Sequence, residues 1–266
     1  MNRIDAKFRE LRHEGKKAFI AYITAGDPSL AATEKLVYAL EGAGTDIIEL
    51  GIPFSDPLAD GPTIQAASQR ALAHHTSLRR VIDMVRRLRK KTDIPIAFMT
   101  YFNPVLKYGI EKCVRDCARA GVDGVIIPDL PYEEAGELIK YSRQKDFATI
   151  FLLAPTSRPE RVRGAARASI GFIYYVSLTG VTGARTVLPP ELVSRCRMIK
   201  SFTTKPLCVG FGVSTPRQAK EIAKVADGVI VGSAIVKTIE RNVHSPRLVR
   251  NVSRFVKTLS RAIHEK

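Results

Sequence analysis

The chain has 266 residues, of which 45% are hydrophobic and 26% charged, and its formal net charge at pH 7 is +16. This composition is typical of a folded protein rather than a disordered one. No apolar run reaches the roughly 20 residues of a membrane span, and the N-terminal stretch lacks the apolar segment of a signal peptide. We therefore expect a single domain over residues 1–266, located in the cytoplasm and not in a membrane.

The excess of 42 basic over 26 acidic residues favours anionic partners, such as a phosphorylated substrate or an acidic protein. The basic residues concentrate on two amphipathic stretches, 79–91 and 247–266. This pattern is more typical of helices with a solvated basic face than of membrane or nucleic-acid binding, because no aromatic platform or known binding motif accompanies it. We expect no nucleic-acid partner.

Short apolar runs alternate with helical patterns along the chain. Runs that are apolar on both faces are typical of parallel strands covered by helices. Eight strand–helix units in about 250 residues favour a closed (β/α)8 TIM barrel over an open doubly wound sheet. The charged N-terminal segment predicts an extra helix, and "GSAIVKTIE" predicts a short helix after the eighth strand. The predicted strands are 18–24, 46–52, 95–101, 124–129, 149–154, 172–178, 206–212 and 228–234.

Chemistry in such barrels lies at the carboxyl ends of the strands and in the loops that follow them. Alternation along 46–52 turns Ile48 and Leu50 toward the helices and Glu49 into the top of the barrel. Burial disfavours the charged form, so we expect a raised pKa that lets Glu49 give and take protons near neutral pH. Asp60, in the next loop, could return over the barrel mouth and form a carboxylate pair with it.

Other interpretations of the acidic residues remain open. Glu49 could pair structurally with an arginine of a neighbouring strand, although no strand end offers one. Asp56 and Asp60 stand in dipeptides that commonly form turns, so either could serve the turn alone. Asp27 is interpreted as a helix cap, and Asp129 is a further catalytic candidate.

Glycine-rich sequences follow or end the last three predicted strands: "GVTGAR", "GFGVS" and "VGSAIV". Backbone N–H groups of such segments can face an anion. In barrels the loops after the last two strands, with the start of a short helix, are the usual phosphate site. The residues expected to line the mouth around an apolar, phosphorylated substrate are Tyr22, Tyr101, Leu152, Tyr174 and Phe211.

Signals for metal or Schiff-base chemistry are weak. No lysine or histidine lies in a predicted strand or directly after one. Cys113 and Cys117 are one helical turn apart, but the five histidines are not spaced to complete a zinc site. We therefore expect no metal.

Six segments together resemble the tryptophan synthase alpha chain family over almost the whole chain. They are "ELGIPFSDPLADGPTIQAAS", "TYFNPVLKYG", "GVIIPDLPYEE", "YYVSLTGVTGAR", "GFGVSTP" and "GSAIVK". The resemblance implies a lyase that cleaves indole-3-glycerol phosphate to indole and glyceraldehyde 3-phosphate. It implies that Glu49 is the general acid/base and that Asp60 holds the indole N–H.

The resemblance implies no cofactor in this chain and a partner beta chain that carries pyridoxal phosphate, in an α2β2 assembly. The loop after the second strand, with the loop near 103–107, would dock on that partner. Thr182 would bond the second carboxylate from a loop that closes over the site. The implied phosphate donors are Gly183, Gly212, Gly232 and Ser233, and the implied lining residues are Tyr101, Leu152, Tyr174 and Phe211, with Tyr22 where many relatives carry Phe.

Two other functions stay open from the sequence. Another phosphosugar barrel enzyme, such as indole-glycerol-phosphate synthase, would be expected to carry catalytic lysines at its strand ends. A catalytically weak subunit that only activates or binds a partner would not need the carboxylate pair.

Overall fold

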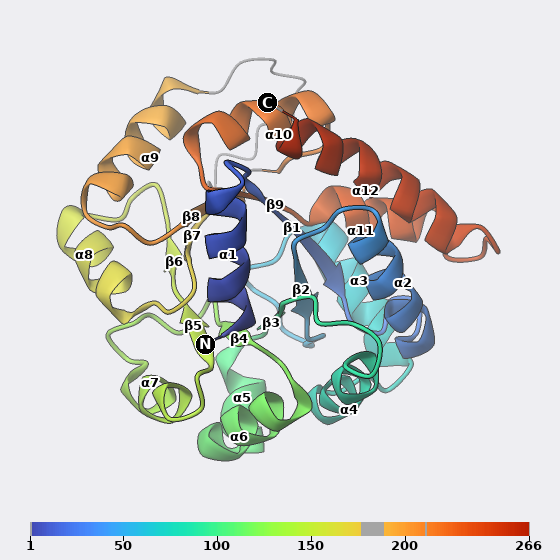
Figure 1. Cartoon of the computed structure of the whole chain (residues 1–266). Helices are drawn as coiled ribbons and strands as arrows, with labels where there is room; N and C mark the ends of the chain where they lie inside the picture. The colour runs from blue at the N-terminus through green and yellow to red at the C-terminus, as the bar shows by residue number, and fades with distance from the viewer. Residues whose placement is uncertain (1, 177–188, 211, 266) are drawn as a thin grey trace.

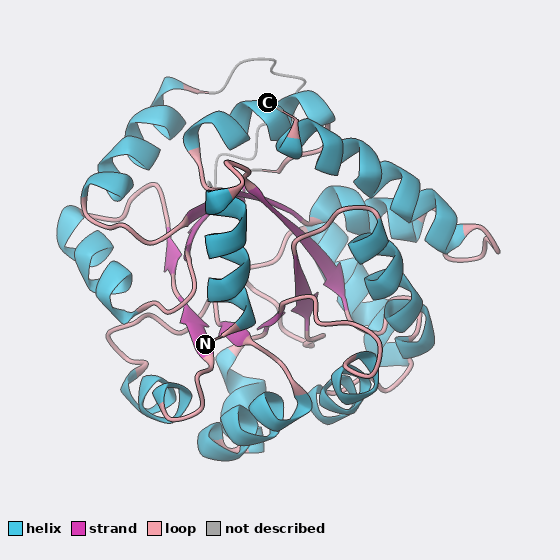
Figure 2. Cartoon of the chain, viewed as in Figure 1, coloured by secondary structure: helices cyan, strands magenta, loops and turns pink. Residues whose placement is uncertain are grey.

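The computed structural model describes residues 2–176, 189–210 and 212–265. Within them the chain forms one parallel sheet surrounded by a ring of helices (Figure 1, Figure 2). The strands are β1 (Ala18–Thr24), β2 (Ile47–Gly51), β3 (Ile96–Met99), β4 (Gly124–Ile126), β5 (Ala148–Ile150), β6 (Leu152–Leu153), β7 (Ile173–Val176), β8 (Leu207–Gly210) and β9 (Gly228–Val231). The helices are α1 (Arg3–His13), α2 (Leu30–Gly42), α3 (Pro62–Ala73), α4 (Leu78–Leu88), α5 (Phe102–Tyr108), α6 (Ile110–Ala120), α7 (Gly136–Arg143), α8 (Pro159–Ala168), α9 (Pro190–Ser201), α10 (Pro216–Val225), α11 (Ser233–Glu240) and α12 (Leu248–His264).

The predicted (β/α)8 barrel is confirmed, with one difference in its fifth strand. The sequence predicts a single strand over 149–154, whereas the structure has β5 and β6 on either side of Phe151. The backbone N–H of Phe151 donates to the hydroxyl of Ser169 at 3.2 Å, which interrupts the ladder there. Because β5 pairs with β4 and β6 pairs with β7, the chain closes the barrel through Phe151.

The extra N-terminal helix is α1, which crosses the centre of the barrel in Figure 1. Its buried side chains Ile4, Phe8 and Leu11 pack in one cluster with inward-facing strand residues. The amide of Asn2 donates to the carbonyl of Asp123, directly before β4, at 2.6 Å. The helix therefore plugs the end where the strands begin, and the opposite end is left for a site.

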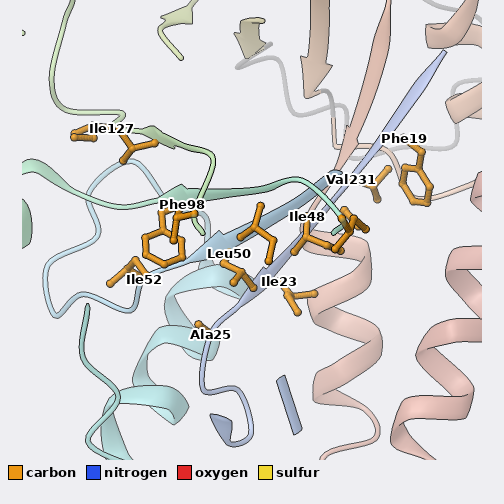
Figure 3. Close-up of a cluster of buried hydrophobic side chains, with 14 of the residues drawn as sticks. Phe19, Ile23, Ala25, Ile48, Leu50, Ile52, Phe98, Ile127 and Val231 are labelled. Atoms are coloured by element: carbon orange, nitrogen blue, oxygen red, sulfur yellow. The ribbon is translucent and has the colours of Figure 1, made fainter. Parts of the chain in front are cut away.

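A larger apolar cluster lies between the outer face of the strands and the helices. Figure 3 shows Ile48 and Leu50 of β2 in this cluster, near Phe98 of β3. Ile47, from the other face of β2, belongs to the cluster inside the barrel. The predicted orientation of β2 is therefore confirmed, and Glu49 lies on its inner face.

The two basic stretches form α4 and α12, and the short helix predicted after the eighth strand is α11. On α12 the buried stripe includes Val256, whereas Phe255 is only partly buried. Within the described residues no helix is both long and apolar enough to cross a membrane.

Asp27 is not a helix cap, contrary to the prediction. Ser29 caps α2, because its side chain accepts a hydrogen bond from the N–H of Ala32 at 3.1 Å. The buried carboxylate of Asp27 instead accepts two hydrogen bonds, at 2.8 and 2.9 Å, from the guanidinium of Arg70 on α3. This pair joins the first βα loop to α3.

Candidate active site

A cavity of about 790 Å³ opens where the strands of the barrel end. Glu49 and Asp60 both line it, so the structure brings the predicted carboxylates together. Three of the predicted apolar and aromatic residues line it as well. These are Tyr22, Leu152 and Tyr174, and the apolar wall also includes Leu58, Ile64, Met99, Pro128, Leu153, Val176, Val213 and Ile230.

Glu49 is 1% exposed, and among the described residues neither of its carboxylate oxygens has a hydrogen-bond partner. Burial is the main cause that raises the pKa of Glu49 to about 8, and the negative charge of Asp60 adds to it. At neutral pH the side chain is therefore mostly protonated. It can donate a proton to a bound molecule and take one back.

Asp60 lies in the loop between β2 and α3 and is half-buried. Burial raises the pKa of Asp60 to about 6, while a hydrogen bond from the hydroxyl of Tyr101 opposes the rise. Asp60 is therefore mostly ionised at a pH where Glu49 is mostly protonated. A proton donor and a carboxylate anion thus face one cavity, which is a common arrangement for acid/base chemistry.

Tyr101 holds the Asp60 loop in place. Its hydroxyl accepts a hydrogen bond from the N–H of Ala59 at 2.9 Å and donates to Asp60. Its ring packs against Phe54, with 5.3 Å between centroids. Tyr101 is not among the residues that line the cavity, so its direct contact with a substrate stays a prediction.

Tyr22 fits against the backbone of the neighbouring strand. A Cβ at Gly51 would lie 2.1 Å from the hydroxyl oxygen of Tyr22, so only glycine leaves room for the ring. This hydroxyl also shares a hydrogen bond of 3.3 Å with Thr24. Burial raises the pKa of Tyr22, which keeps the phenol neutral beside the carboxylates.

Gly212, Gly232 and Ser233 line the same cavity. Gly212 has a φ of +59°, a left-handed conformation that favours glycine. Gly232 is the N-cap of α11 and Ser233 is its first residue. The open N–H groups and partial positive charge of this helix start make it suited to an anion.

Three predicted site residues lie outside the described residues: Thr182, Gly183 and Phe211. Asp129 is described but exposed and is not among the residues that line the cavity, and its carboxylate accepts a hydrogen bond from the N–H of Phe102 at 2.9 Å. Asp129 therefore serves the start of α5 in this structure.

Sequence analysis missed Arg161, which lines the cavity from the first turn of α8. Arg161 stands at the start of a helix, beyond the strand ends and the residues directly after them, where functional side chains are expected. A basic residue in the first turn of the helix after a barrel strand is the signal that would have found it.

No group of three or more histidine, cysteine or acidic side chains in the described part of the chain is placed to hold a metal. The sulfur atoms of Cys113 and Cys117 lie 4.0 Å apart within the outer apolar cluster.

A family model and three known proteins that are similar to this chain carry one family name. Residues 8–264 match the family model described as "Tryptophan synthase alpha chain". The tryptophan synthase alpha chain of Geobacter sulfurreducens is 51% identical over 263 residues, covering 99% of each chain. That of Caldanaerobacter subterraneus subsp. tengcongensis is 50% identical over 259 residues, covering 97% of this chain and 98% of the relative. The crystal structure of tryptophan synthase subunit alpha from Legionella pneumophila matches with a TM-score of 0.92 at 38% identity, covering 99% of this chain and 98% of that chain.

Proposed function

The chain belongs to the tryptophan synthase alpha chain family, and we propose that its cavity cleaves indole-3-glycerol phosphate to indole and glyceraldehyde 3-phosphate. The observation that carries this proposal is the buried Glu49, without a partner among the described residues, facing one cavity with Asp60. No lysine is among the described residues that line the cavity, which disfavours the alternative of a barrel enzyme with catalytic lysines.

In the first step Glu49 donates its proton to C3 of the indole ring. The ring becomes a positively charged indolenine. Asp60, as a carboxylate, accepts a hydrogen bond from the ring N–H and stabilises this charge. The pKa values of about 8 and about 6 give the two residues the protonation states that this step needs at neutral pH.

In the second step the Glu49 carboxylate takes the proton of the hydroxyl on the side-chain carbon bonded to the ring. The bond between this carbon and C3 breaks, and its electron pair returns to the ring to give indole. The carbon that held the hydroxyl becomes the aldehyde of glyceraldehyde 3-phosphate. Glu49 ends protonated, as it began. Because the electron pair returns to the positively charged indolenine, the ring itself is the electron sink and the step needs no Schiff base.

The rest of the cavity would orient the substrate. The phosphate binds at Gly212, Gly232 and Ser233, where the start of α11 stabilises an anion. The indole ring packs in the apolar wall that Tyr22 and Leu152 help to form. Thr182, Gly183 and Phe211 are assigned to the same substrate contacts on the resemblance alone.

We infer that a beta chain carrying pyridoxal phosphate receives the indole, and that this chain holds no cofactor itself. Leu58 is 94% exposed in the loop after β2, and Leu106 is 55% exposed on α5. They lie on the two segments that the family resemblance assigns to the partner, and an α2β2 assembly is proposed on the same basis.

The proposal is tested by measuring indole release from indole-3-glycerol phosphate by the purified chain, with and without a matching beta chain. We expect slow release by the chain alone and a sharp rise when the partner is added. A folded chain that releases no indole in either condition would overturn the proposal.

A further inference from the structure

The cavity is unevenly charged. Of the described residues that line it, Glu49, Asp60 and Arg161 are the ionisable ones with a carboxyl or basic side chain, and Arg161 is the one cation. Burial dominates the raised pKa values of both carboxyl groups, and Arg161 is not among the groups that lower them. The guanidinium is therefore not the group that sets the ionisation of the carboxylate pair.

Arg161 is loosely held. Its Nη1 atom lies 3.5 Å from Oε1 of Glu133, in the segment between β4 and α7, and both side chains are nearly half exposed. A half-exposed pair with one long contact contributes little to stability. A guanidinium has five N–H donors in a planar fork, so this contact leaves donors for a ligand. Arg161 can exchange Glu133 for a stronger anion at small cost.

The proposed substrate brings such an anion. Its phosphate is a dianion near neutral pH, and it must enter a cavity whose Asp60 is mostly ionised. The glycine-rich loop and the start of α11 offer backbone N–H groups with partial charge. A full positive charge on a residue that lines the same cavity would offset the repulsion, and a guanidinium suits the geometry of a phosphate.

We propose that Arg161 binds the phosphate group of the substrate and that Glu133 competes with the substrate for Arg161. This inference rests on the proposed function, because it adds a specificity residue to the same site. Arg161 then discriminates for phosphorylated over unphosphorylated substrate, while Glu49 and Asp60 act on the ring and its neighbouring carbon.

Arg161→Gln is the variant that tests the proposal, with Arg167→Gln as the matched control. Arg167 is exposed on the same helix and does not line the cavity. Each variant is assayed with indole-3-glycerol phosphate and with indole-3-glycerol, which lacks the phosphate. We expect Arg161→Gln to raise KM for the phosphorylated substrate about tenfold, with kcat changed less than about twofold. KM for indole-3-glycerol stays unchanged, and Arg167→Gln changes neither KM.

Glu133→Gln gives an effect of opposite sign. Removing the competing carboxylate lowers KM for indole-3-glycerol phosphate about twofold, whereas loss of a merely structural ion pair would not improve binding. Equal KM values for Arg161→Gln and Arg167→Gln would overturn the proposal, and so would an equal rise of KM for both substrates. A wild-type chain that cleaves neither substrate would instead overturn the proposed function.

Discussion

At the end of the barrel where strands begin, an aspartate directly precedes β2, β4 and β9. Each carboxylate accepts the N–H of a residue at the start of a neighbouring strand and contacts at least one basic side chain. Asp46 pairs with Phe19 and His264, Asp123 with Ile96, Arg3 and Arg89, and Asp227 with Leu207 and Lys200. At the other end Glu49 is as deeply buried as any of them, and among the described residues its oxygens have no partner.

The difference shows what each end is built for. Burying a carboxyl group without a partner costs free energy, and proteins rarely leave such groups unsatisfied. This chain satisfies three carboxylates at one end, so the isolation of Glu49 is specific to its position. The paired aspartates hold strands together, whereas the isolated carboxyl group keeps a proton that it can transfer.

Glu49→Gln removes the isolated carboxyl group at the end of the barrel that holds the cavity, and it has the largest expected effect. The amide keeps the shape of the side chain but cannot exchange the proton, so kcat for indole release falls by about 10²–10⁴-fold. Steady-state assays measure the loss, and the melting temperature at pH 8 shows that the fold is not weakened. Retention of most of the wild-type kcat would contradict the role of Glu49.

Asp123→Ala removes one of the paired carboxylates at the end of the barrel where the strands begin. Asp123 is 4% exposed, and its removal leaves the guanidinium of Arg89 without its carboxylate partner. Loss of one member of a buried pair lowers the free energy of unfolding by about 3–5 kcal/mol. Urea unfolding measures the loss in free energy of unfolding. The kcat of the protein that remains folded should stay within about twofold of the wild-type value. A stable but inactive variant would contradict the division between the two ends.

The pH dependence of the free energy of unfolding tests whether Glu49 is protonated in the folded chain. Its pKa is about 8 in the folded chain against an ordinary value of 4.5, so between these values the unfolded chain ionises Glu49 and the folded chain does not. The contribution of Glu49 to stability is therefore full below pH 4.5 and is lost as the pH rises toward 8. Glutamine does not titrate, so the stability advantage of Glu49→Gln over the wild type should grow by a few kcal/mol from pH 5 to pH 8. Thermal or urea unfolding across that range measures it, and a constant difference would contradict a raised pKa.

Tyr101→Phe has the smallest expected effect. The substitution removes the hydroxyl that bonds Ala59 and Asp60. The pKa of Asp60 should rise further, so the acidic limb of the kcat/KM profile moves to higher pH. We expect kcat/KM at pH 7 to fall about tenfold, the value of a hydrogen bond to a charged group. Tyr108→Phe, which removes a hydroxyl outside the cavity, is the control, and an equal pH profile for both variants would contradict the assignment.

The sequence was informative where local rules decide. The apolar alternation of β2 placed Glu49 inside the barrel, and the closed fold followed from eight repeated units. It was not informative where distant side chains decide. The break at Phe151 depends on Ser169, and the partner of Asp27 is Arg70 on another helix. No local pattern encodes these contacts.

The positions of two residues in or near the cavity, Arg161 and Tyr101, also depend on contacts that no local pattern encodes. Arg161 reaches the cavity because α8 begins beside it, which depends on the path of the preceding loop. The hydroxyl of Tyr101 supports the Asp60 loop, because it accepts a hydrogen bond from the N–H of Ala59, and its contact with a substrate stays a prediction.

The most direct test of the account is a carbon-13 NMR titration of the Glu49 carboxyl carbon in the folded wild-type chain, assigned by its absence in Glu49→Gln. We expect an apparent pKa of about 8, because burial disfavours the charged form. A pKa near the ordinary value of 4.5 would show an ionised, solvated or paired carboxylate, and would contradict Glu49 as the proton donor.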